Sequence, residues 1–75
     1  MSLRKELAKE VQLLENEIKA LESKRIRSMS ELMESLISKK EPDETEMQFF
    51  RQYTAEIEVK REKLVEITNQ LKSIV

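Results

Sequence analysis

The stretch KKEPDE, residues 39–44, decides how this chain folds. It contains Pro42, the only proline of the 75 residues, and because the chain has no glycine, no other residue forces a turn. Proline disfavours helical backbone at the residue before it, which is Glu41 here. We therefore predict a single domain of two long helices joined by a short turn, over about residues 2–40, 41–44 and 44–74.

Acidic side chains gather at this turn and form an acidic tip, which consists of Glu41, Asp43, Glu44 and Glu46. Asp43 and Glu46 have the spacing of a capping box, and Thr45 with Gln48 has the same spacing. Carboxylates also stabilise the positive N-terminal end of a helix. We interpret the acidic tip mainly as capping and solubility. A metal site is the less favoured alternative, because a calcium-binding EF-hand loop needs a glycine.

Apolar residues recur along both predicted helices in alternating steps of three and four, which is the 3.5-residue period of a coiled coil. A short turn makes the two helices antiparallel neighbours. The predicted fold class is all-α: an antiparallel coiled-coil helical hairpin that pairs into a dimeric four-helix bundle. The first seam is Leu7, Val11, Leu14, Ile18 and Leu21, and the second is Phe50, Tyr53, Ile57, Lys60, Leu64, Ile67, Leu71 and Ile74.

A fold-back centred on Pro42 and Asp43 also predicts the register between the two seams. It leaves Leu3 and Leu7 without partners, because their partners would lie beyond Val75. The expected pairs are Val11 with Ile74, Leu14 with Leu71, Ile18 with Ile67, Leu21 with Leu64, Ser28 with Ile57, and Leu32 with Tyr53.

The same register places Arg25 opposite Lys60, as a polar layer within the seam. We expect both side chains to extend outward beside carboxylates of their own helices, and such layers often fix the register of a coiled coil. An anion site for an acidic partner is the alternative. Neighbouring cations complete a basic belt at this height: Lys24, Arg27, Arg61 and Lys63.

The composition narrows the classes of function. Charged residues make up 39% of the chain, against about 25% in an average domain. The net charge is −1, so nucleic acid is not an expected partner, and the basic belt is the only feature that would support one. No apolar run approaches the roughly 18 residues of a transmembrane span. The N-terminus lacks the apolar stretch of a secretory signal, and there is no cysteine, so we expect a cytoplasmic protein without a membrane role.

The residue types needed for common chemistry are missing. Without histidine or cysteine the chain has neither the usual nucleophile–base pairs nor the commonest metal ligands. Without glycine it has no phosphate-cradling loop. We expect no catalytic residues, no cofactor and no metal, and therefore not an enzyme.

Apolar residues beyond the seams crowd the half of the hairpin near the turn, where the apolar face of helix 1 widens to include Ile26 and Ile37. Methionine-rich surfaces adapt to varied partners. We expect a face that binds protein, in an adaptor, scaffold or small chaperone. The favoured partner is a second copy, in a homodimer, and the alternative is a helix of another protein. The predicted partner-binding residues are Met29, Leu32, Met33, Leu36, Met47, Phe49, Phe50 and Tyr53.

A second reading of the function starts from Asp43-x-x-Glu46-x-x-x-Phe50, an acidic pair followed by an aromatic residue. This pattern resembles the tip of the N-terminal coiled-coil hairpin of the Gre-type transcript cleavage factors. Pro42 and Met47 stand where that family has glycine and asparagine. The resemblance implies a hairpin that inserts its tip into the secondary channel of RNA polymerase, where the acidic residues help to hold a catalytic magnesium ion.

The third reading rests on size and amphipathicity alone. Small helical hairpins serve as co-chaperones in type III secretion, where they wrap needle or filament subunits. The likeness is at the level of the fold.

Overall fold

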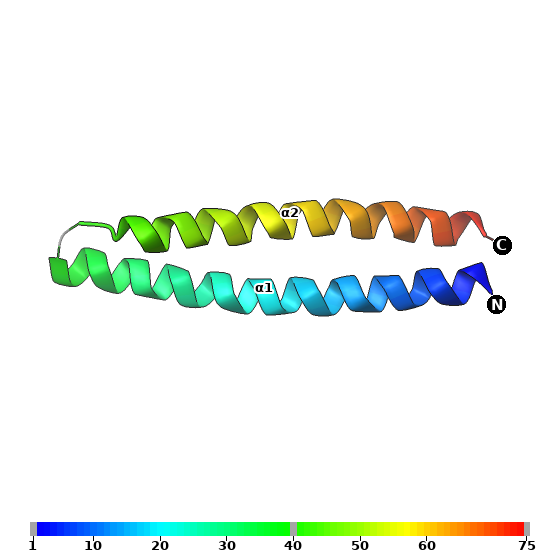
Figure 1. Cartoon of the computed structure of the whole chain (residues 1–75), viewed down its shortest axis with the longest axis horizontal. Coiled ribbons are helices and arrows are strands. Elements are labelled where there is room, and N and C mark those ends of the chain that lie inside the picture. The colour runs from blue at the N-terminus through cyan, green and yellow to red at the C-terminus, as the bar shows by residue number, and fades with distance from the viewer. Residues whose placement is uncertain (1, 40, 75) are drawn as a thin grey trace.

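The computed structural model describes residues 2–39 and 41–74. Helix α1 (Leu3–Lys39) and helix α2 (Glu44–Ser73) pack against each other as an antiparallel pair measuring 56 × 14 × 14 Å. The start of α1 and the end of α2 therefore lie side by side at one end of the rod (Figure 1). The predicted helical hairpin is confirmed. The expectation that helix 1 reaches Lys40 falls on a residue outside the described ranges.

The hydrophobic core lies in the half of the hairpin nearest the termini, which we call the base half (residues 3–25 and 56–74). Ile57 is its most enclosed side chain, with 1% of its surface exposed, and it packs with Ile18 and Leu21. A second cluster consists of Leu7, Leu14 and Ile67, with Val11, Leu64, Leu71 and Ile74 packed against it. The alternating seam residues of this half therefore close into a core, as their spacing predicts.

The half nearest the turn, which we call the tip half (residues 26–39 and 41–55), is built differently. Among its described residues no hydrophobic side chain is buried, and the one buried residue is Ser28, with 4% of its surface exposed. The Ser28 hydroxyl donates to Glu46, with oxygen–oxygen distances of 2.9 Å to Oε2 and 3.1 Å to the backbone carbonyl. The contact between the helices in this half is therefore partly polar.

The predicted register is wrong by about seven residues, which is one heptad. Ile57 was expected opposite Ser28, yet it packs with Ile18 and Leu21, while Ser28 bonds to Glu46. Leu7, expected to lack a partner, is buried in the core, whereas Leu3 is exposed. The seams still face each other, because a shift of one heptad returns each seam to the same face.

The turn causes this shift. Residues 41–43 already run back alongside the last turns of α1 before α2 begins (Figure 1). The Ser35 hydroxyl donates to the Glu41 carbonyl at 3.2 Å, which holds the returning segment against α1. Glu41 through Asp43 are not helical, so they cover more length per residue than a helix does. Helix α2 therefore starts several residues short of the end of α1.

Asp43 is the N-cap of α2, and its Oδ1 accepts from the backbone N–H groups of Thr45 (2.9 Å) and Glu46 (3.2 Å). This is one half of the predicted capping box. The Glu46 side chain, which would complete the box, accepts from Ser28 of α1 instead. Glu46, in the first turn of α2, therefore joins the two helices.

Candidate protein-binding surface

Large apolar side chains line one edge of α1 in the tip half. They follow each other in steps of three and four residues, with one further step to Ile37, and this spacing places them on one side of a helix. Between 47% and 80% of each side chain is exposed. We call this set the exposed stripe, and it consists of Ile26, Met29, Met33, Leu36 and Ile37.

Two members of the exposed stripe, Ile26 and Ile37, are missing from the residues predicted to bind a partner, although the widened apolar face contains them. Spacing identifies them as part of the same edge. Ile26, for example, lies seven residues, or about two helical turns, before Met33. Leu32, which was predicted, is half-buried and lies about one helical turn after Ser28, the residue that contacts α2. It therefore forms part of the contact between the two helices more than of the exposed edge.

The predicted partner-binding residues of α2 differ in how far they are exposed. Met47, Phe50 and Tyr53 are half-buried, and Tyr53 packs against the core cluster around Ile57. Phe49 is exposed, and its ring stacks on that of Tyr53 with centroids 6.3 Å apart and planes 18° from parallel. Phe49 is therefore the main exposed aromatic side chain of the tip half.

Phe49 and the exposed stripe lie on opposite edges of the hairpin. Phe49 and Tyr53 line a pocket of about 240 Å³ together with Lys24, Arg27, Ser28, Glu31 and Glu46. Met29 stands two residues from both Arg27 and Glu31, and two residues correspond to a rotation of about 200° around a helix. The structure therefore does not bring all eight predicted residues into one surface, but separates an apolar edge from an aromatic and charged one.

The charged edge contains one carboxyl group with altered acidity. A hydrogen bond to Glu46 and charge repulsion from it raise the pKa of Glu31, and the guanidinium of Arg27 acts in the opposite direction. Glu31 belongs to α1 and Glu46 to the first turn of α2. The two acids therefore meet across the helix contact, next to the Ser28 hydrogen bond.

The acidic tip is largely open to solvent. Glu41, Asp43 and Glu44 are exposed, and Glu46 is half-buried. Asp43 and Glu46 line a shallow hollow with Glu31 and Glu34. Within residues 2–39 and 41–74, no group of three or more acidic side chains has an arrangement that could hold a metal ion. What the structure assigns to the tip is the capping of α2 and the contact with Ser28.

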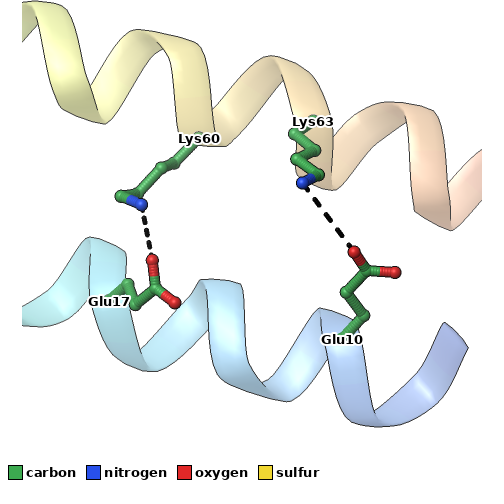
Figure 2. Close-up of polar contacts among 4 residues, drawn as sticks. All are labelled: Glu10, Glu17, Lys60 and Lys63. Carbon is green, nitrogen blue, oxygen red and sulfur yellow. Dashed lines mark hydrogen bonds and ion pairs between the residues drawn. The ribbon is translucent and has the colours of Figure 1, made fainter. Parts of the chain in front are cut away.

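The predicted layer of Arg25 opposite Lys60 is wrong. Lys60 forms an ion pair with Glu17, which lies eight residues, or about 12 Å along the helix, from Arg25. Figure 2 shows Lys60 and Lys63 extending across from α2 toward Glu17 and Glu10 of α1. Because the register is shifted by one heptad, opposite charges meet where like charges were expected. Arg25 is half-buried at the boundary between the two halves.

The remaining cations of the predicted basic belt are also dispersed. Arg61 pairs with Glu22 at 2.8 Å, and Lys63 lies 3.8 Å from Glu10. Lys24 and Arg27 line the pocket beside Phe49. The belt is therefore not a continuous basic surface.

Neither described helix contains a segment long and apolar enough to cross a membrane. Comparison with family models, with curated proteins and with solved structures finds no match to this chain.

Proposed function

We propose that this hairpin is a protein–protein interaction module, an adaptor, scaffold or small chaperone, that binds helices along the exposed stripe and associates with itself as a homodimer. One observation carries the proposal. The base half encloses six large apolar side chains between its helices, whereas the described part of the tip half encloses none and leaves five on one edge of α1 in contact with water. An apolar edge of this kind, flanked by polar residues, is typical of protein interaction sites.

The energetics require a partner that covers several of these side chains at once. Complete burial of one large apolar side chain contributes about 1.5–3 kcal/mol, so a half-exposed one has on the order of 1 kcal/mol left to gain. Association costs about 4–15 kcal/mol. A second helix laid along the whole edge would reach all five residues.

Two aspartate variants with equal starting exposure test this proposal. Met33, in the exposed stripe, and Leu13, in the base half, each have 58% of their surface exposed, and both lie on α1. Immobilised wild-type chain and immobilised Leu13→Asp chain should capture the same partner protein, and both should also capture free copies of this chain. Immobilised Met33→Asp chain should capture at least tenfold less of each. Circular dichroism should show unchanged helix content in both variants. Equal recovery by all three would refute the proposal.

A second candidate function is insertion of the acidic tip into a larger machine, as the resemblance to transcript cleavage factors implies. Its support is the exposure of Glu41, Asp43 and Glu44 at the far end of the rod. The double variant Asp43→Asn with Glu46→Gln keeps a capping side chain, since asparagine caps helices as well as aspartate does. It should abolish stimulation of transcript cleavage by RNA polymerase under this alternative and leave binding through the exposed stripe intact. The co-chaperone role stays a prediction based on size.

A further inference from the structure

The exposed stripe stops at the boundary between the two halves. The same edge of α1 continues toward the base through Glu22, Lys19 and Glu15, which precede Ile26 in steps of four, three and four residues. Lys19 and Glu15 are exposed and Glu22 is half-buried. The same edge of α1 is thus apolar in the tip half and charged in the base half, so a partner helix can be accommodated by apolar contacts only along the tip half.

The apolar area fits an interface with a second copy. Five side chains with 47% to 80% of their surface exposed present on the order of 500 Å² of apolar surface, so two copies would bury roughly 1,000 Å² in total, which is the lower limit for a specific interface. In a two-fold interface the same patch serves both partners, so it must be complementary to itself. Antiparallel pairing centred near Glu31 satisfies this, because Ile26 lies level with Leu36 of the other copy, and Met29 with its Met33.

We propose that two copies of this chain pair tip to tip through their exposed stripes, with their α1 helices antiparallel, so that the two pairs of termini lie at opposite ends of the assembly. The inference rests on the proposed function, because both use the exposed stripe, and it names the partner and its orientation. It makes the dimer a four-helix bundle only where the tip halves overlap.

Charge selects the antiparallel orientation. If the two α1 helices ran parallel and in register, each of Glu15, Lys19 and Glu22 would lie beside its own copy. Like charges placed next to each other across a helix contact are destabilising. In the antiparallel arrangement the base halves point away from each other, and these charged positions stay in water. With the centre near Glu31, the two copies of Ser73 lie roughly 80 Å apart at 1.5 Å per residue.

Single cysteine variants test the interface without interference, because the natural chain has no cysteine. Ser30 is exposed and lies beside the exposed stripe, four residues after Ile26 and three before Met33. Ser38, the matched control, lines the hollow beside Glu31 and Glu34, on the other side of α1. With a short bis-maleimide crosslinker at low micromolar protein, Ser30→Cys should form linked dimers at least tenfold faster than Ser38→Cys. Equal rates for both variants would overturn pairing with a second copy.

A cysteine at the base tests the orientation. Donor- and acceptor-labelled Ser73→Cys chains, mixed in equal amounts, should show almost no energy transfer above that of a diluted monomer. Parallel pairing would bring the labels within about 20 Å and produce strong transfer, which would overturn the antiparallel arrangement. If both cysteine tests fail, pairing with a second copy is wrong. The proposed function still holds in that case if Leu13→Asp binds another protein that Met33→Asp does not bind.

Discussion

The base half and the tip half share the same two helices but differ in how far their apolar side chains are buried. In the base half, six apolar side chains are buried between the helices, and three of them, Ile57, Leu14 and Ile67, are almost fully enclosed. In the tip half, the position that faces α2 is Ser28, and the large side chains of α1 point sideways. A two-helix hairpin has room for only one narrow seam of buried residues, so a wider apolar face leaves surface for a partner.

This difference also assigns distinct roles to the two halves. The base half contains the contacts that hold the hairpin together, with the ion pairs of Lys60, Arg61 and Lys63 at its rim. Such exposed pairs contribute about 0–1 kcal/mol each, so the enclosed apolar residues dominate its stability. The tip half adds less stability and presents the exposed stripe. Variants in the two halves should therefore separate folding from binding.

The largest expected effect is the loss of the core of the base half. Ile57→Ala removes most of the most enclosed side chain and leaves a cavity, which should lower the free energy of unfolding by about 2–4 kcal/mol. Met33→Ala, in the exposed stripe, should change it by no more than about 1 kcal/mol under conditions where the chain is monomeric. Urea denaturation followed by circular dichroism measures both. Equal losses would show that the two halves do not differ in packing.

A smaller effect is expected from the buried hydroxyl of the tip half. Ser28→Ala removes the hydrogen bond to Glu46 and should destabilise the chain by about 1 kcal/mol. Ser30→Ala, at an exposed position of the same helix, corrects for the higher helix propensity of alanine. The difference between the two variants in urea denaturation is the measurement. If Ser28→Ala is at least as stable as Ser30→Ala, the polar contact does not hold the tip half together.

The smallest expected effect is on the pH dependence of stability. The hydrogen bond to Glu46 and the repulsion from it raise the pKa of Glu31 above 4.5, so the folded chain binds the proton more tightly than the unfolded chain does. The stabilisation from this proton is therefore present below the raised pKa and is lost as the pH rises through it. Glu31→Gln should remove this component, whereas Glu58→Gln, at an exposed site in the base half, should leave it. Thermal unfolding between pH 4 and pH 7 compares the three proteins, and identical pH profiles would contradict the assignment.

The helices and the faces they bury could be predicted from spacing, but the register could not. Heptad periodicity repeats every seven residues, so a shift of one heptad matches each seam equally well. The register is therefore set by the position at which the chain folds back, and that position depends on how the segment around Glu41 returns along α1. A signal for the correct register was nevertheless present in the sequence. The predicted register placed Arg25 against Lys60, whereas the observed one places Lys60 against Glu17.

The membership of the exposed stripe was predicted only in part, for a similar reason. Periodicity identified a surplus of apolar residues around Met29 and Met33, but it could not divide them between two edges of a hairpin. That division requires knowing which residue of α1 faces α2, and the answer is the polar Ser28. Phe49 consequently lies with Lys24 and Arg27, away from the exposed stripe.

The solution mass over a range of concentrations tests the central claim, that the tip half carries a self-complementary binding surface. By light scattering coupled to size exclusion, the wild-type chain and Leu13→Asp should have twice the chain mass of 8.9 kDa and dissociate on dilution. Met33→Asp should have the mass of one folded chain at every concentration. A wild-type chain that is monomeric throughout, or a Met33→Asp variant that dimerises as well as Leu13→Asp, would contradict the claim.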